Sequence, residues 1–155
     1  MLKFYEYSKL KKEEKNNTLL EKIYNVTKCL EKDYPNHYNW FYNKFVKELD
    51  GEKREIIYCV LNEKIVGVVF LKNTMEEKKI CTIYIDDKYR NKGIGTILLE
   101  KSFDFLGTNK PLITMPSYKE KCFEKIINKY KWIKIQTINY YYSNNKEIVF
   151  NQNLI

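Results

Sequence analysis

The chain has 155 residues, of which 44% are hydrophobic and 31% are charged, and its formal net charge is +8. This length suits one domain with a real core, and the charged content argues against an integral membrane protein. The longest apolar run, residues 66–71, is far too short to cross a bilayer, and the first residues lack the basic-then-apolar pattern of a secretion signal. We therefore expect a cytoplasmic protein with one domain over residues 1–155 and no membrane partner.

Hydrophobic periodicity and turn residues predict the elements of the first half of the chain. Alternation at residues 2–7 indicates a strand, and helical spacing follows at residues 11–32 and 37–49. Three segments rich in β-branched and aromatic residues, typical of an antiparallel meander, occupy residues 55–62, 64–72 and 79–86.

After residue 86 the chain changes character. A polar loop over residues 88–96 leads into a helix at residues 94–106, which Gly107 is suited to terminate. The remaining predicted elements are a strand at residues 111–115, a helix at 118–130 and two strands at 132–142 and 147–153. 

The element order is therefore β-α-α-β-β-β-α-β-α-β-β. The strand, loop, helix and strand in the middle form a crossover unit, so part of the sheet should be parallel. We predict an α/β (α+β) fold, with a mixed, mostly antiparallel, twisted sheet of about seven strands flanked by four helices.

The positive charge is compatible with an anionic partner, including nucleic acid, but lysines are scattered along the chain as on a solvated surface. No recognised RNA-binding motif is present. The four cysteines form no CxxC pair, so we expect reduced thiols buried among apolar side chains. His37 is the single histidine, which makes a His-based metal site implausible, and we predict no metal.

The sequence from Arg90 to Thr96 has the features of an anion-binding turn. Glycines are scarce in the chain, yet Gly93 and Gly95 both stand where a loop enters a helix. The first N–H groups of a helix lack internal partners and lie at the positive end of its dipole, so they bind phosphate readily. The spacing fits neither a P-loop nor a dinucleotide fingerprint, in which a third glycine would stand at Leu98.

Residues 83–99 resemble the acetyl-CoA signature of the GNAT N-acetyltransferase superfamily. That signature is Arg/Gln-x-x-Gly-x-Gly/Ala after an apolar strand with an acidic-aromatic lead-in, and every defining position is matched here. The element order is also similar to the family's fold over nearly the whole chain. The resemblance implies one GNAT-like N-acetyltransferase domain over residues 1–155 with acetyl-CoA (CoA) as the acyl donor.

The resemblance also implies roles for particular residues. Backbone groups of Ile83, Tyr84 and Ile85 would pair with the pantetheine arm like an added strand. Arg90 would lie near the phosphates together with Lys92. The N–H groups that would hold the pyrophosphate are those of Asn91, Lys92, Gly93, Ile94, Gly95 and Thr96.

For catalysis, the resemblance implies that the strand carrying Ile83 and Ile85 splays from the next strand, residues 112–115, so that the thioester enters the gap. A substrate amine would attack the acetyl carbonyl directly, and a backbone N–H near Ile85 would polarise that carbonyl. No metal and no covalent enzyme intermediate are needed.

The family's proton donor is a tyrosine on the fourth helix, and its expected position here is Ile127, which cannot transfer protons. Tyr130 is the nearest phenol and our candidate catalytic residue, followed by Tyr118. The alternative is that Tyr130 packs beside Trp132. Ser117 and Glu120 stand where the family often has an asparagine that contacts the cofactor.

The acceptor site in such folds lies between the first two helices and the final hairpin. Aromatic residues there could hold an amine by cation–π contacts, or could be core and sheet-covering residues. His37 as a base is a further hypothesis. The residues concerned are Tyr34, Pro35, His37, Tyr38, Trp40, Phe41, Tyr140, Tyr141 and Tyr142.

We therefore predict an acetyl-CoA-dependent N-acetyltransferase that acts on a primary amine of a small molecule, a peptide N-terminus or a lysine. Two alternatives stay open: a catalytically weak acyl-CoA-binding regulatory module, and an acetyltransferase directed at RNA or aminoacyl-tRNA. The sequence leaves open whether the protein is a monomer or a homodimer.

Overall fold

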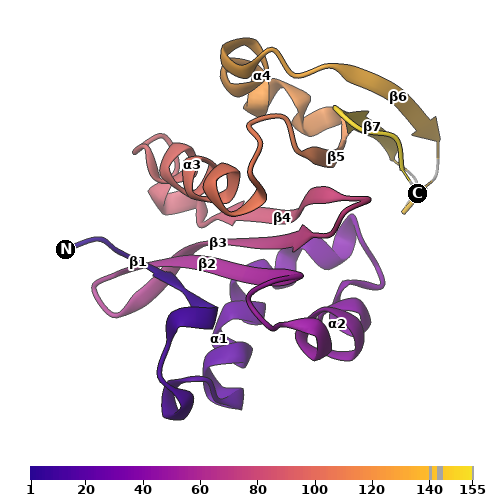
Figure 1. The fold of residues 1–155 in the computed structure, drawn as a ribbon. Coiled ribbons are helices and arrows are strands. Elements are labelled where there is room, and N and C mark those ends of the chain that lie inside the picture. Colours follow the sequence, from indigo (N-terminus) through magenta and orange to yellow (C-terminus); the bar gives the residue numbers. More distant parts are fainter. Residues whose placement is uncertain (140, 143–144, 155) are drawn as a thin grey trace.

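Seven strands form one sheet in the computed structural model, which describes residues 1–139, 141–142 and 145–154 (Figure 1). The strands are β1 (Lys3–Glu6), β2 (Arg54–Leu61), β3 (Lys64–Asn73), β4 (Lys78–Ile85), β5 (Leu112–Pro116), β6 (Lys134–Asn139) and β7 (Lys146–Phe150). Their spatial order is β1-β2-β3-β4-β5-β7-β6. Among the described residues only β4 and β5 pair in parallel, so the mixed, mostly antiparallel sheet is confirmed.

Helices cover both faces of the sheet. The first face carries α1 (Asn17–Thr27) and α2 (His37–Trp40), and the second carries α3 (Ile94–Leu106) and α4 (Glu124–Tyr130) (Figure 1). Short 3-10 turns occupy Tyr7–Lys9, Lys12–Glu14, Lys28–Lys32, Val46–Glu48, Asp87–Tyr89 and Ser117–Phe123, and a π-helical turn occupies Phe41–Phe45. The predicted element order is confirmed.

Two apolar clusters bind the helices to the sheet. Side chains alternate between the faces along a strand, so Ile57 of β2 belongs to the cluster under α3, while Ile56 belongs to the cluster under α1. The second cluster also holds Phe41, Phe45 and Phe70, all fully buried. Burial of each such side chain contributes about 1.5–3 kcal/mol, so this cluster holds the π-helical turn firmly against β3.

Two predicted helices are shorter than their periodicity indicated. The helix expected from residue 11 begins only at Asn17, because the Asn16 side chain accepts the Leu19 N–H at 2.9 Å and caps it. The helix expected from residue 118 begins only at Glu124. The 3-10 turn before it carries Tyr118, whose hydroxyl donates to Asp33. The hydrophobic periodicity of residues 118–130 cannot indicate a contact with so distant a residue.

The cysteines depart from the expectation of uniform burial. Cys59 is buried and Cys81 is half-buried, whereas Cys29 and Cys122 are exposed. The exposed pair lies on the 3-10 turns Lys28–Lys32 and Ser117–Phe123, where helices with a buried face were predicted. All four thiols are free, as expected.

Candidate active site

The turn before α3 has the geometry of an anion cradle. Gly93 caps the helix with φ +84°, and Asn91 also has a positive φ of 62°. The first bond within the helix runs from the Ile97 N–H to the Gly93 carbonyl at 3.2 Å, so the preceding N–H groups have no acceptor inside α3. A Cβ added at Gly93 would meet nothing within 4 Å, and the first turn of α3 holds no acidic residue. The N-terminal, positive end of the α3 dipole therefore faces open space, and a pyrophosphate fits there.

Arg90 and Lys92 flank this turn. The Arg90 Nε donates to the Ile85 carbonyl at 3.0 Å, and its Nη2 lies 3.0 Å from Asp87 Oδ1. The Lys92 Nζ lies 5.6 Å from the centre of the Tyr89 ring. Ion pairs as exposed as that of Arg90 contribute little free energy, so both cations are available to a phosphate.

The end of β4 has an unpaired edge. The Asp86 N–H donates to the Val66 carbonyl of the β3 side at 2.9 Å. Backbone groups alternate in direction along a strand, so those of Tyr84 also face β3, while those of Ile83 and Ile85 face away from it. On that side β5 pairs with β4 only at Lys79 and Ile80.

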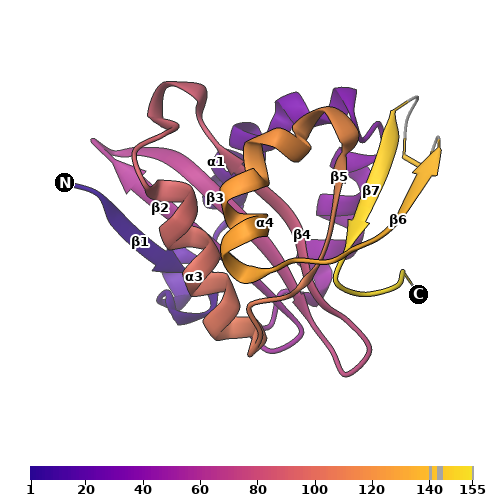
Figure 2. The ribbon, with the colours of Figure 1, turned by 90° about the horizontal axis from the view of Figure 1, so that it is seen from above.

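The two strands therefore run apart towards the end of β4 (Figure 2), as the family resemblance implied. The separation begins at Cys81, where the register of β4 against β3 also shifts by a bulge. The N–H and C=O groups of Ile83 and the N–H of Ile85 can pair with an extended, amide-containing ligand, while the Ile85 carbonyl accepts the Arg90 Nε. The backbone groups of Tyr84 point to β3 instead.

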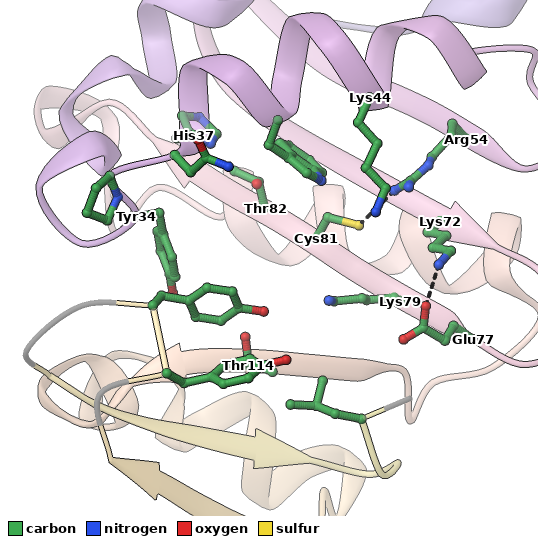
Figure 3. Close-up of a pocket in the computed structure, with 16 residues that line it drawn as sticks. Tyr34, His37, Lys44, Arg54, Lys72, Glu77, Lys79, Cys81, Thr82 and Thr114 are labelled. Atoms are coloured by element: carbon green, nitrogen blue, oxygen red, sulfur yellow. Dashed lines mark hydrogen bonds and ion pairs between the residues drawn. The ribbon is translucent and has the colours of Figure 1, made fainter.

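Two cavities meet at this split. A cavity of about 60 Å³ lies between β4 and β5, and a larger one of about 380 Å³ opens on the α1–α2 side of the sheet (Figure 3). Both are lined by Tyr34, Cys81, Thr82 and Thr114. An acyl chain entering along β4 and an acceptor in the larger cavity would meet at these four residues.

Tyr34 stands at this junction with a buried carboxylate behind it. Its hydroxyl donates to Glu147 Oε2 at 2.9 Å, and Glu147, on β7, is 2% exposed. Burial raises the pKa of the Glu147 carboxyl, although hydrogen bonds with Thr114 and Tyr34 oppose the shift. Burial, followed by the charge of Glu147, also raises the pKa of Tyr34, so its phenol keeps its proton.

His37 lines the larger cavity but is held as a packed, neutral ring. Its Nε2 lies 2.9 Å from Thr27 Oγ1, and the Thr27 hydroxyl donates its own proton to the Tyr24 carbonyl. In this arrangement Nε2 carries the proton of the neutral ring and donates it to the Thr27 oxygen. Burial lowers the pKa of His37 to about 4, which agrees with a neutral core residue better than with a base.

The other predicted aromatic residues divide between cavity and core. Trp40, Tyr141 and Tyr142 line the larger cavity with Tyr34 and Pro35, whereas Phe41 is fully buried in the core. Tyr38 is 57% exposed. Tyr140 lies outside the described residues.

Tyr130 lies away from both cavities. Its ring packs edge-on against Phe103 at 4.9 Å between centroids, beside Trp132, as the packing alternative expected. Tyr118 lines neither cavity either, and its hydroxyl donates to Asp33. The catalytic role of Tyr130 stays a prediction to which its position adds no support.

Sequence reasoning did not single out Glu147 or give a function to Arg54. Glu147 stands next to Ile148, Val149 and Phe150 in a buried strand, and an acidic residue beside such a run is the signal that could have found it. Arg54 is one of two arginines in the chain, and the structure buries it beside Cys81, with 3.5 Å between Nη1 and Sγ. Burial raises the pKa of Cys81 and keeps its thiol neutral.

A splayed parallel strand pair, an anion cradle at the next helix and an acceptor cavity at the split define an acyl-CoA-dependent acyltransferase. The model of the GNAT acetyltransferase family matches residues 18–110, which is more than half of the chain. The chain therefore belongs to the GNAT acetyltransferase family, and acetyl-CoA is its acyl donor.

Solved structures share the fold at low sequence identity. The ribosomal-protein-S18-alanine N-acetyltransferase of Escherichia coli is 16% identical, with a TM-score of 0.67 over 97% of this chain and 92% of that one. Naa50 of Arabidopsis thaliana, bound to a bisubstrate analogue, is 20% identical, with a TM-score of 0.68 over 98% and 99%. A Bacillus anthracis acetyltransferase in complex with acetyl-CoA is 16% identical, with a TM-score of 0.58 over 72% and 70%.

No curated protein matches the sequence significantly. Within the described part of the chain, no helix is both long and apolar enough to cross a membrane. The same residues contain no cluster of three His, Cys, Asp or Glu side chains placed to hold a metal ion.

Proposed function

We propose that the protein transfers the acetyl group of acetyl-CoA to a primary amine on a small molecule, a peptide N-terminus or a lysine. The observation that carries this proposal is the junction of the two cavities at the split between β4 and β5. When bound, acetyl-CoA supplies an acetyl thioester, which the amine attacks directly. The domain that does this spans residues 1–155.

For cofactor binding, we assign the N–H groups at the start of α3 to the pyrophosphate. Gly93 and Gly95 leave the approach to these groups open. Ile83 and Ile85 offer the pantetheine arm the backbone groups that face away from β3, with Tyr84 between them, and an N–H near Ile85 faces the acyl carbonyl. The full set of residues around the phosphates is Arg90, Asn91, Lys92, Gly93, Ile94, Gly95 and Thr96.

For proton transfer, the Tyr34–Glu147 pair is better placed than Tyr130. An amine reaches the site as an ammonium ion and must lose a proton before it can attack. The ammonium gives this proton to the Tyr34 oxygen while the Tyr34 hydroxyl passes its own proton to the Glu147 carboxylate. The amine becomes neutral and the phenol is restored, and the burial that raises the pKa of Glu147 makes it a stronger base.

The test is turnover with a panel of primary amines, measured as release of the CoA thiol, in the wild type and Tyr34→Phe. Loss of a general acid–base group costs about 100- to 10,000-fold in rate, so Tyr34→Phe should lose kcat while it keeps acetyl-CoA binding. Tyr141→Phe is the matched control, because Tyr141 lines the same cavity but is 45% exposed. Acetyl-CoA binding without turnover on any amine would favour the regulatory module instead.

A further inference from the structure

The larger cavity is unusually basic for a site that receives a cation. Four basic side chains line it, Lys44, Arg54, Lys72 and Lys79, and Glu77 is the one acidic side chain among the described residues that line it. The Lys72 Nζ lies 2.5 Å from Glu77 Oε1, so one lysine is neutralised and an excess of positive charge remains.

Arg54 is buried without a full set of partners. The residue is 3% exposed, and its Nε has no hydrogen-bond partner. Its Nη1 contacts only a thiol, that of Cys81 at 3.5 Å, and its Nη2 lies 3.7 Å from Glu48 Oε1. A guanidinium has five N–H donors, and a buried charge left so poorly paired is costly. Folded proteins rarely leave a buried polar group without hydrogen-bond partners, and a bound anion would supply the partners that Arg54 lacks.

The neighbouring elements hold Arg54 against the cavity. Its guanidinium lies 5.3 Å from the centre of the Phe45 ring, in the π-helical turn behind it. In Figure 3 the Arg54 guanidinium points towards Cys81, and the Lys79 ammonium points into the cavity from β4. The charges of Lys72, Lys79 and Arg54 all act on Glu77: burial alone would raise its pKa, yet the Lys72 hydrogen bond and these charges lower it.

This basic cluster is separate from the cradle at α3. Lys79 stands at the start of β4 and Ile85 at its end, next to the turn that holds Arg90. Six residues of extended strand span about 20 Å. The cluster therefore lies beyond the acyl junction, in the cavity that receives the acceptor.

We propose that Arg54, Lys72, Lys79 and Lys44 form an anion subsite that selects acceptors carrying a carboxylate or phosphate group besides the reacting amine. This inference rests on the proposed function, because it names the substrate class of the same site. The amine is held at the junction beside Tyr34, and the anionic group lies among the basic side chains. A polyamine would place its further positive charges against Arg54 and is disfavoured.

The test uses pairs of amines that differ only in the anionic group. The probes are ω-amino acids from β-alanine to 6-aminohexanoate, each compared with the n-alkylamine of equal length, and O-phosphoethanolamine compared with ethanolamine. Calorimetric binding to the protein saturated with CoA gives affinities, and CoA release with acetyl-CoA gives kcat and KM. The carboxylate and phosphate arms identify which anion the subsite prefers.

We expect at least one anionic probe to bind about 10- to 100-fold more tightly than the matched amine without the anionic group, as charge-assisted hydrogen bonds imply. Lys79→Gln should remove most of this preference, because it weakens binding of the anionic probe and not of the alkylamine. Lys78→Gln is the matched control, because Lys78 precedes it on β4 and lines neither cavity. Arg54→Lys keeps the buried charge and should weaken the preference without unfolding the protein.

Equal or tighter binding of the alkylamines, or equal losses for both probes in Lys79→Gln, would overturn the inference. Failure of the proposed function has a different signature: the anionic probes would bind preferentially to the CoA complex, yet no amine would be acetylated. The calorimetric arm thus decides the anion subsite whether or not turnover is observed.

Discussion

Gly95 offers a direct test of the cofactor cradle. It occupies the second position of α3, and an added Cβ would meet only Ile85 Cγ1, at an ordinary contact distance of 3.9 Å. A larger side chain therefore fits without displacing the core. We expect Gly95→Glu to place a carboxylate where the pyrophosphate lies, and Gly95→Gln to add the same bulk without the charge.

The effect of the charge can be estimated from Coulomb's law. A carboxylate about 5 Å from one phosphate charge is repelled by about 0.8 kcal/mol in bulk water and by about 3 kcal/mol at an effective dielectric constant of about 20. The half-buried position of Gly95 lies between these limits. We therefore expect acetyl-CoA to bind Gly95→Glu between about 4-fold and 150-fold more weakly than Gly95→Gln.

Stability should change in the opposite direction. A glutamate in the first turn of a helix stabilises it by about 0.3–1 kcal/mol, and replacing a helical glycine contributes about 0.5–1 kcal/mol more. Weaker binding in Gly95→Glu therefore cannot be ascribed to unfolding if its melting temperature is equal to or above that of the wild type.

The assay is calorimetric titration of acetyl-CoA into the wild type, Gly95→Gln and Gly95→Glu at low and high salt. The difference in acetyl-CoA affinity between Gly95→Gln and Gly95→Glu should become smaller at high salt, because ions screen the repulsion between the carboxylate and the phosphate. Equal affinity of all three proteins at low salt would refute the assignment of the pyrophosphate to the start of α3.

Three further predictions concern pH and packing. Burial lowers the pKa of His37 to about 4, so between pH 6.5 and pH 4 the unfolded chain binds a proton at His37 and the native state does not. The free energy of unfolding should therefore fall by about 3 kcal/mol as pH drops through this window. Urea unfolding of His37→Gln should show little of this pH dependence. The rate of acetylation should rise with pH through the raised pKa of Glu147, because its carboxylate forms there. If the pH–rate profile of Glu147→Gln kept this rise, proton transfer through Tyr34 to Glu147 would be contradicted. An added Cβ at Gly67 would meet Cys59 Sγ and Ile85 Cδ1 at 3.0 Å, so Gly67→Ala should cost about 1–3 kcal/mol of unfolding free energy in urea, and an unchanged midpoint would show that the α3 interface is looser than described.

The sequence by itself determined the helices and strands whose ends are marked by residues with a strong conformational preference. Helix α3 runs from Ile94 to Leu106 as predicted, because Gly93 and Gly107 flank it and both adopt a positive φ that favours glycine. The anion cradle is predictable for the same reason, since it needs only one turn and the first residues of one helix. The sheet and its one parallel pair also follow from a sequence in which a helix links two strands.

Tertiary structure decided the parts of the site that join distant segments. Tyr34 and Glu147 are 113 residues apart and meet only because β7 returns beside β5. Arg54 enters the acceptor cavity from β2, and nothing next to it in the sequence shows that Lys44, Lys72 and Lys79 surround the same space. Such contacts depend on packing between strands and helices, which periodicity and turn residues do not encode. For the same reason Tyr130, chosen by its distance along the chain, packs against Phe103, while Tyr34 stands at the junction of the cavities.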